Sequence, residues 1–254
     1  MILITQPRVG TSHNEIIALQ AAAEMLGWEV IPAPTGWRLD EELTQSGKKG
    51  VPYGSQIFCE VIAQQMNWKL WGQPFDWLAR LPKAVTKRQV DFMTLGKAKQ
   101  LTEKKFIKPA DDKCFDAKVY EPGELVTHES ISDETPVLVS EVVSWSMEYR
   151  GFVGLNSSCH SVMTWSNYLF HGQINEPHLH QMIPGDLEHI ETFYRDVLWG
   201  CFRRDITGPC VIDVGVIPGK GWAVIETNPA WASGLYGCDP LQALKVMEQA
   251  VGVL

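Results

Sequence analysis

The chain opens with an apolar run followed by a helical pattern and a second apolar run. Residues 1–6 are mostly apolar and end at Gln6-Pro7, which predicts a short buried strand. Residues 13–27 carry apolar side chains at helical spacing and end in Gly27, which is typical of a helix and its C-terminal cap. Residues 28–32 predict a second strand. This order is typical of a parallel α/β unit.

The pattern changes between residues 47 and 83. Residues 47–52 are rich in Gly and Lys and are interpreted as a loop, whereas residues 57–65 predict a helix. Near residues 81–83 the spacing of apolar positions changes again. We therefore expect an N-terminal α/β domain over residues 1–82 and a second domain over residues 83–254.

The second domain is richer in predicted strands. The strongest candidates are residues 105–109 and 137–143, with shorter ones at 118–120 and 124–126 and another beginning at 150–155. Residues 210–217 and 222–227 flank Pro218-Gly219-Lys220-Gly221, which predicts a hairpin turn. Helices are expected at 189–201 and 240–251. The elements together indicate an α/β (α+β) protein.

Composition narrows the class of protein. Thirty acidic and 22 basic residues among 254 give a net charge of −8, which argues against a nucleic-acid partner. No apolar stretch approaches the ~18–20 residues that span a bilayer, and the start lacks a basic signal-peptide region. We therefore expect a cytoplasmic protein with no membrane partner. Six cysteines without a CxxC pair are expected to be reduced thiols.

Several familiar motifs do not match. Residues 215–221 look like a P-loop, but the spacing is one residue short and Gly221 stands where Ser or Thr would hold Mg²⁺. No GxGxxG follows the first strand, and neither GxSxG nor HExxH occurs. His171, His178 and His180 lack a carboxylate or thiol at metal-ligand spacing, so a substrate-facing or surface loop is favoured.

Acidic and amide side chains converge on the predicted hairpin. Glu226 and Asn228 share one strand face, and an antiparallel partner brings Asp213 opposite them. Two carboxylates and an amide oxygen are ligands that suit Mg²⁺. The same spacing also fits an Asp and a Glu that are paired with lysines on a solvent-exposed face.

Cations gather elsewhere in the second domain. Lys108 ends a predicted strand just before Pro109, and Lys87, Arg88 and Lys113 are candidates for the same neighbourhood. A lysine at a strand end is suited to bind a phosphate as a point charge. Ordinary solvated surface lysines are the alternative interpretation.

A third group of candidates lies over residues 140–150. Here a strand is expected to end near Val143 and another to begin at Arg150. The free backbone groups of a strand edge can pair with an adenine ring, and Glu141 can accept from its exocyclic amine. Glu148 is placed to accept from a ribose hydroxyl, and Arg150 to reach a phosphate. An ordinary strand–loop–strand with solvated charges is the alternative.

Taken in chain order, these three groups resemble the ATP-grasp superfamily and its carboxylate–amine ligases. The details are similar to a small clade of bacterial and phage proteins long catalogued as a domain of unknown function. The likeness covers about residues 82–240. It is carried by Thr86-Lys87-Arg88, Phe106-Ile107-Lys108-Pro109, Asp112-Lys113-Cys114-Phe115, Ser140-Glu141-Val142-Val143, Glu148-Tyr149-Arg150-Gly151-Phe152-Val153, Asp213, Glu226-Thr227-Asn228-Pro229-Ala230-Trp231 and Gly234-Leu235-Tyr236-Gly237.

The resemblance implies an ATP-grasp fold with a small N-terminal α/β pre-domain. Residues 83–143 would form the small ATP-binding subdomain, and residues 144–254 the C-terminal metal and substrate subdomain. The resemblance also implies a role for each candidate. Lys108 contacts the α- and β-phosphates, with Arg88 or Lys87 as a second cation. Glu141 and the Val143 backbone hold adenine, and Glu148 holds the ribose. Asp213, Glu226 and Asn228 bind one or two Mg²⁺ ions, and Arg150 stabilises the transferring phosphoryl group or the acyl-phosphate.

One segment departs from the family pattern. Residues 110–116 contain no glycine, although a Gly-rich lid usually follows the Lys-Pro strand, and Lys113 is the candidate to replace part of the lid's contacts. The resemblance implies an ATP- and Mg²⁺-dependent ligase that joins a small-molecule or peptide carboxylate to an amine through an acyl-phosphate. A kinase-like phosphotransferase and a non-catalytic ATP-binding regulator are the alternatives. The loop over residues 156–185 is expected to select the substrate.

Overall fold

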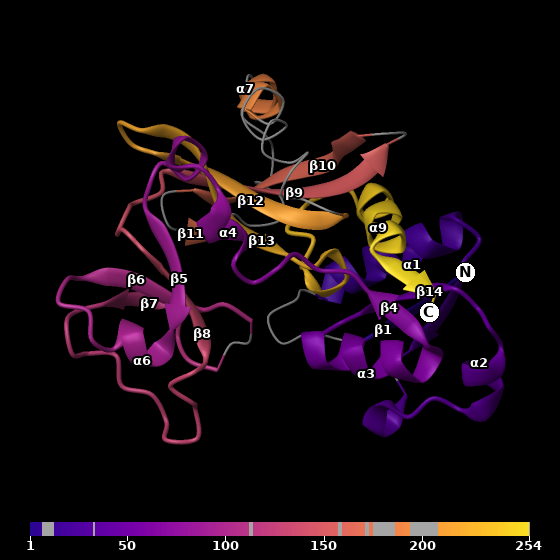
Figure 1. The fold of residues 1–254 in the computed structure, drawn as a ribbon. Coiled ribbons are helices and arrows are strands. Elements are labelled where there is room, and N and C mark those ends of the chain that lie inside the picture. Colours follow the sequence, from indigo (N-terminus) through magenta and orange to yellow (C-terminus); the bar gives the residue numbers. More distant parts are fainter. Residues whose placement is uncertain are drawn as a thin grey trace.

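The computed structural model of the chain describes residues 1–6, 13–32, 34–111, 114–156, 159–170, 173–174, 186–193 and 208–253. Over these residues the strands form sheets of three, five, two and four strands. Figure 1 shows the five-stranded sheet between the four-stranded sheet on one side and the N-terminal elements on the other. None of the helices within the described ranges has the length and apolar character needed to cross a membrane.

The N-terminal part is a parallel α/β unit, as the sequence predicts. Strands β1 (Ile2–Thr5), β2 (Glu29–Pro32) and β3 (Gly50–Tyr53) are parallel, with β1 in the centre. Helix α1 (His13–Met25) connects the first two strands. The prediction of a loop at 47–52 was wrong in part, because β3 is a fully buried strand. Its Gly50 lies so close to β1 that a Cβ atom would approach the Ile2 carbonyl oxygen to 2.4 Å.

Short polar side chains begin the other helices of this part. The 3-10 turn η1 (Thr35–Trp37) precedes α2 (Glu41–Gln45), where the Asp40 carboxylate accepts from the Leu43 amide. The Ser55 hydroxyl caps α3 (Gln56–Met66) in the same way, by accepting from the Phe58 amide. Such caps satisfy amides that have no partner inside the helix. The predicted helix at 57–65 is thereby confirmed.

The N-terminal unit shares its core with residues from the far end of the chain. Helix α9 (Pro240–Gln249) begins at an Asp239 cap and packs its apolar side chains into the same cluster as those of β1 and α3. Strand β14 (Val251–Val253) then pairs antiparallel with β4 (Trp68–Leu70). The predicted helix at 240–251 therefore ends two residues early, because the chain turns into a strand.

The four-stranded sheet has the order β5-β8-β6-β7 and is antiparallel throughout. Its strands are β5 (Val90–Thr94), β6 (Lys105–Pro109), β7 (Lys118–Tyr120) and β8 (Pro136–Ser140), and its helices are α4 (Trp77–Arg80), α5 (Lys83–Thr86) and α6 (Leu95–Ala98). The strand predicted at 137–143 ends at Ser140. The strand predicted at 124–126 is wrong, since Glu124 instead closes a turn onto the Glu121 carbonyl and pairs with Lys118.

The five-stranded sheet has the order β11-β10-β9-β12-β13. Its strands are β9 (Met147–Asn156), β10 (Cys159–Phe170), β11 (Gln173–Ile174), β12 (Cys210–Ile217) and β13 (Gly221–Asn228), with α7 (Asp186–Phe193) near them and the 3-10 turn η3 (Ala230–Ala232) after β13. The predicted hairpin is confirmed. The interpretation of 156–185 as a loop was wrong where β10 and β11 lie, and β9 begins three residues before Arg150. The helix predicted at 189–201 begins at Asp186, and its residues after Phe193 lie outside the described residues.

Candidate functional site

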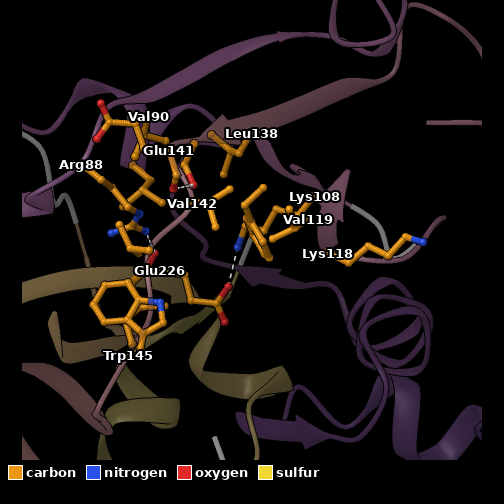
Figure 2. Close-up of a pocket in the computed structure, with 15 residues that line it drawn as sticks. Arg88, Val90, Lys108, Lys118, Val119, Leu138, Glu141, Val142, Trp145 and Glu226 are labelled. Carbon is orange, nitrogen blue, oxygen red and sulfur yellow. Dashed lines mark hydrogen bonds and ion pairs between the residues drawn. The ribbon is translucent and has the colours of Figure 1, made fainter. Parts of the chain in front are cut away.

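A cavity of about 400 Å³ lies between the four-stranded sheet and the hairpin of β12 and β13 (Figure 2). Its apolar lining comes from both sheets, from helix α4 and from the segment that joins the sheets: Leu78, Val90, Phe106, Val119, Leu138, Val142, Trp145 and Ile225. Five of the sequence-predicted site residues line the cavity: the charged Arg88, Lys108, Glu141 and Glu226, and the apolar Val143. A mostly apolar pocket of this size with a few convergent polar groups is typical of a small-molecule site.

The segment between β8 and β9 forms one wall of this cavity because it is held at both ends. The Glu141 amide donates to the Gln89 carbonyl over 3.1 Å, and the Ser146 amide donates to the Val216 carbonyl over 3.0 Å. Between these anchors, residues 142–145 pass from one sheet to the other alongside the cavity. Val143, predicted to meet adenine through its backbone, lies on this segment.

Lys108 and Glu226 come from different sheets and pair with each other in the lining of the cavity. The Lys108 ammonium on β6 pairs with the Glu226 carboxylate on β13, and the Asn228 amide donates to the other Glu226 oxygen over 2.9 Å. Burial alone would raise the pKa of Glu226, but Lys108 and Asn228 outweigh burial and lower it from 4.5 to about 2. The carboxyl group is therefore ionised at neutral pH.

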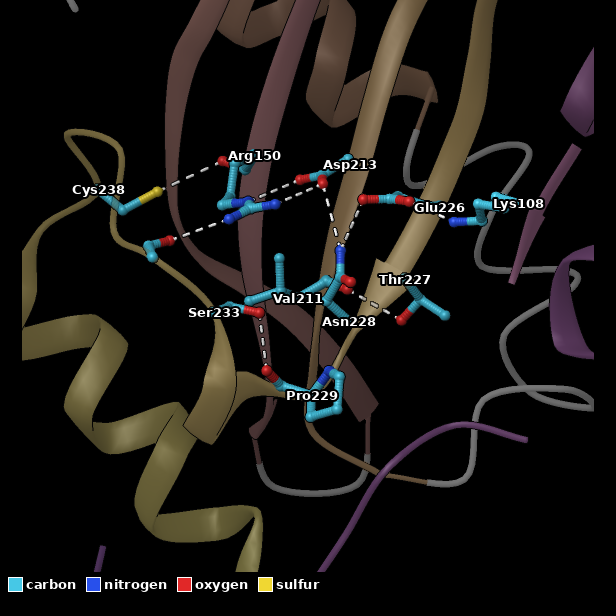
Figure 3. Close-up of polar contacts among 11 residues, drawn as sticks. Lys108, Arg150, Val211, Asp213, Glu226, Thr227, Asn228, Pro229, Ser233 and Cys238 are labelled. Carbon is cyan, nitrogen blue, oxygen red and sulfur yellow. Dashed lines mark hydrogen bonds and ion pairs between the residues drawn. The ribbon is translucent and has the colours of Figure 1, made fainter. Parts of the chain in front are cut away.

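Arg150 and Asp213 form a second, more deeply buried pair (Figure 3). The guanidinium on β9 donates to both Asp213 oxygens, over 2.9 and 2.7 Å, and to the Gly234 carbonyl over 3.2 Å. The Tyr236 ring lies 4.8 Å from the guanidinium carbon. Asp213 is fully buried, which raises the pKa of its carboxyl group, and Arg150 opposes that shift. In this structure the Arg150 guanidinium is therefore paired with the Asp213 carboxylate.

Arg88 is buried at the edge of the cavity and contacts backbone carbonyls. It donates to Val224 and Ile225 on β13, over 2.7 and 2.9 Å, and to Thr86 over 3.1 Å. Its guanidinium carbon lies 5.0 Å from the centre of the Trp145 ring. Burial lowers the pKa of Arg88 to about 10, against the opposing effect of Glu226 and Glu148, so Arg88 stays a cation at neutral pH.

The remaining predicted residues lie around this centre. Glu141 pairs at 3.2 Å with Lys83 at the rim, and hydrogen bonds to the Gln89 backbone and Lys83 lower its pKa. Lys87 ends α5 in the left-handed region, and its carbonyl accepts from Lys220; its side chain is not part of the cavity lining. Glu148 lies two residues before Arg150 on β9, opposite Gly215. Lys113, together with His171, His178 and His180, lies outside the described residues.

The donor set on β12 and β13 fits a small hard cation. Glu226 and Asn228 share a face of β13, and Asp213 lies directly opposite Glu226. Carboxylate and amide oxygens are the ligands that Mg²⁺ prefers, and an amide presents its oxygen by rotating half a turn. Both Asp213 oxygens accept from the buried Arg150, whereas the Glu226 oxygens accept from Asn228 and from Lys108, whose side chain is more exposed than that of Arg150. Over the described ranges no group of three His, Cys, Asp or Glu side chains is placed to hold a metal, and the set here has two carboxylates.

Sequence reasoning assigned no role to several residues that line the cavity. Trp145 covers one side of Arg88, and Ile225, whose carbonyl accepts from Arg88, precedes Glu226 on β13. The chain has ten tryptophans, and a position just after a strand does not distinguish Trp145 from those in the core. Lys118 also lines the cavity while it pairs with Glu124 at 3.1 Å.

Comparisons with solved structures identify the fold. A D-cycloserine synthetase, DcsG, aligns with a TM-score of 0.56 at 11% identity over 98% of this chain and 99% of that one. The N5-carboxyaminoimidazole synthase from Aspergillus clavatus, in complex with ADP and 5-aminoimidazole ribonucleotide, gives 0.55 at 11% identity over 97% and 76%. A RimK domain ATP-grasp protein from Sphaerobacter thermophilus DSM 20745 gives 0.51 at 14% identity over 98% of each chain.

A sequence-family comparison agrees with these structural matches. No curated protein matches the chain significantly. The model of the ATP-grasp domain of the R-2K clade, family 2, matches residues 85–246, which include both sheets around the cavity and every described candidate residue. The expected ATP-grasp fold is confirmed. The chain belongs to family 2 of the R-2K clade of ATP-grasp domains.

Proposed function

We propose that the protein is an ATP-dependent ligase that joins a carboxylate to an amine through an acyl-phosphate. One observation carries the proposal: Lys108 from β6 and Glu226 from β13 form an ion pair in the lining of a cavity of about 400 Å³ between two sheets. A cation and a carboxylate so placed suit the phosphates of a nucleotide and its metal. The ligase names of two structures with this fold, a D-cycloserine synthetase and an ADP-bound N5-carboxyaminoimidazole synthase, also support the proposal.

The two ends of the cavity suit the two ends of ATP. Val90, Leu138 and Trp145 provide an apolar end for adenine beside the backbone of residues 141–143. At the other end, Lys108 binds the α- and β-phosphates. Arg88, which lies beside Trp145, or Lys87 is the second cation of the sequence hypothesis. Glu148 is proposed to hold the ribose, and Lys113 to contact the phosphates from the segment after β6.

The chemistry needs little from the protein beyond positioning and charge. The substrate carboxylate attacks the γ-phosphate, ADP leaves, and an amine then displaces phosphate from the acyl-phosphate. Mg²⁺ held by Glu226, Asn228 and an Asp213 oxygen would neutralise charge on the phosphates. Lys108 and Arg150 provide fixed positive charge beside the transferring group. Electrostatic stabilisation of this kind is the main source of catalysis in phosphoryl transfer.

We further propose the division of the chain that the sequence suggested. Residues 1–82 form the pre-domain, residues 83–143 the small ATP-binding subdomain, and residues 144–254 the subdomain that binds metal and substrate. The substrates are small-molecule or peptide carboxylates and amines.

Thermal melting with nucleotides tests the proposal first. Wild type and Glu226→Ala are melted with Mg²⁺ and ATP, ADP, GTP or no nucleotide, with Glu42→Ala, an exposed change on α2, as the control. Ligand at ~100 times its dissociation constant adds about 2.7 kcal/mol to stability. ATP is expected to raise the melting temperature of wild type and Glu42→Ala but not of Glu226→Ala. No rise with ATP in wild type would overturn the nucleotide site.

Product analysis then separates the ligase from its alternatives. Amino acids and peptides are screened for ADP release that requires both a carboxylate and an amine. A stable phosphorylated product formed without an amine would replace the ligase by a phosphotransferase. ATP binding without turnover across the screen would favour a regulator.

A further inference from the structure

Strand β13 contains one extra residue at Ile225. Asp213 pairs with Glu226, whereas the next residue of β12, Val214, pairs with Val224, so Ile225 has no partner on β12. An extra residue of this kind is a β-bulge, which bends the strand and re-aims the side chains beyond it.

The bulge decides which face Glu226 occupies. If the register set by the hairpin turn continued past Val214, Glu226 would pair with Ile212. Ile212, Val214 and Val224 all belong to one buried apolar cluster. Side chains alternate between faces along a strand, so a one-residue shift moves Glu226 from that apolar face to the face of Asp213. The carboxylate thus reaches Lys108 only because the bulge is present.

Arg88 contacts the bulge and the residue before it. Its two terminal nitrogens donate to the carbonyls of Val224 and Ile225, which follow each other in the chain. In a regular strand, consecutive carbonyls point to opposite sides, so their joint use by one guanidinium reflects the bulged backbone. Strand β13 is at the edge of its sheet, and Arg88 supplies donors that a further strand would otherwise provide.

Arg88 is itself fixed in place from several directions. It is 5% exposed, it donates to the Thr86 carbonyl, and its own carbonyl accepts from the Thr86 hydroxyl over 2.6 Å. The Trp145 ring covers the guanidinium. A planar guanidinium presents several donors in a rigid fork, whereas a lysine has one nitrogen on a flexible stem. Lysine at this position would keep the charge but lose the paired contact.

We propose that Arg88 is a positioning residue that holds the Ile225 bulge and thereby places Glu226 opposite Asp213 and within reach of Lys108. The sequence hypothesis of a direct phosphate contact is the competing role. This inference deepens the proposed function, and the test of it by ADP binding rests on that function. The test of it by urea unfolding needs no nucleotide.

The first experiment is a double-mutant cycle in urea without ligand. Unfolding free energies are measured for wild type, Arg88→Lys, Glu226→Gln and the double variant. Arg80→Lys is the matched control, because this exposed arginine on α4 pairs with Asp76 instead. If Arg88 acts through Glu226, Glu226→Gln lowers the unfolding free energy less in the Arg88→Lys background than in wild type. In the Arg80→Lys background it lowers the unfolding free energy as much as in wild type. Additive effects in both backgrounds would overturn the proposal.

The second experiment measures ADP binding by calorimetry with Mg²⁺ or with EDTA. Because Glu226 acts on the nucleotide through the metal, Arg88→Lys is expected to lower ADP affinity about tenfold or more in Mg²⁺, as is typical of residues that orient metal ligands. In EDTA no metal links Glu226 to the nucleotide, so the ADP affinity of Arg88→Lys is expected to stay within about twofold of the wild-type value. A comparable loss in EDTA would assign Arg88 to the phosphates and overturn the positioning role.

Failure of the proposed function and failure of the Arg88→Lys variant to fold can both be told apart from failure of the positioning role. If wild type binds no ADP in Mg²⁺, the proposed function fails, and the urea cycle alone judges the role of Arg88. If Arg88→Lys does not fold, a crystal structure of the wild type with Mg²⁺ and ADP replaces it. Arg88 still bound to the Val224 and Ile225 carbonyls supports the proposal, and Arg88 turned onto a phosphate overturns it.

Discussion

Asp213 and Glu226 lie directly opposite each other on neighbouring antiparallel strands, and each carboxylate pairs with its own cation. Like charges in such a position repel, so each cation is needed to hold the pair together. Arg150 comes from the same sheet and is almost fully buried, whereas Lys108 comes from the other sheet and has a side chain that is 20% exposed. We therefore expect Lys108 to be the cation that changes partner when phosphates arrive.

Replacement of Lys108 tests that expectation against a neighbouring lysine. Lys108 and Lys118 both line the cavity, but Lys118 pairs with Glu124. Lys108→Met is expected to lower the affinity for ADP in EDTA about tenfold, the equivalent of ~1.4 kcal/mol for a lost charge-assisted contact. Lys118→Met should lower it far less. Calorimetry on both variants makes the comparison, and equal losses would contradict the assignment.

The Arg150–Asp213 pair predicts a large stability effect that a second substitution reverses. Arg150→Met leaves the fully buried Asp213 without its cation and is expected to cost about 3–5 kcal/mol in unfolding free energy. Replacing Asp213 as well, by Leu, should recover most of that loss. The control is Lys48→Met in the exposed Lys48–Glu29 pair, expected to cost less than about 1 kcal/mol. Urea titrations in which Arg150→Met and Lys48→Met cost the same would contradict the prediction.

Glu226 should make stability depend on pH below about 5. Its pKa is about 2 in the folded protein against an ordinary 4.5, so the unfolded chain takes up its proton first as the pH falls. The stabilisation is complete above about pH 5 and is lost toward pH 2, with a total of about 3 kcal/mol for a shift of this size. Burial raises the pKa of Asp213 and works in the opposite direction, so the comparison is with Glu226→Gln. Parallel stability curves for the two proteins between pH 6 and 3 would be inconsistent with this shift.

Thiol reactivity checks the packing around the site. Cys59, Cys210 and Cys238 are buried, and burial raises the pKa of Cys210 to about 12 and that of Cys238 further. Since the thiolate is the reactive form, these thiols should resist iodoacetamide at pH 8 in the native protein. Cys114 is only partly buried and should react before these three. Peptide mapping by mass spectrometry, with urea-unfolded protein as the control, reads out each position.

The parts of the fold that follow local rules were predictable from the sequence. The opening α/β unit has regular apolar spacing and a terminal Gly27, and the β12–β13 hairpin has a turn of Pro and Gly. Strand β10 was missed because its register shifts twice, between Val162 and Thr164 and between Asn167 and Leu169, which breaks the alternation. Strand β3 was missed because four buried residues that include Gly and Pro have the composition of a loop.

Some contacts of the candidate site were also predictable from the sequence, and others were not. The opposition of Asp213 and Glu226 was predicted, but it depends on the bulge at Ile225, because a regular hairpin register would pair Glu226 with Ile212. The partner of Asp213 was not predicted, because Arg150 lies 63 residues away in the chain and meets it only through strand pairing. The contacts of Arg88 with Val224 and Ile225 depend on a bulge, and the sequence of β13 has no feature that separates an extra residue from a regular one.

The packing of α9 against α1 and the pairing of β14 with β4 also bear on biosynthesis. Apolar side chains of β1 and α3 belong to one cluster with those of α9, which the ribosome adds only after both larger sheets. Domains usually fold from the N-terminus as they emerge during synthesis, but here the first sheet lacks its covering helix until residues 240–253 are free. Residues 1–82 are therefore expected to complete their core only after residues 240–253 have left the ribosome exit tunnel.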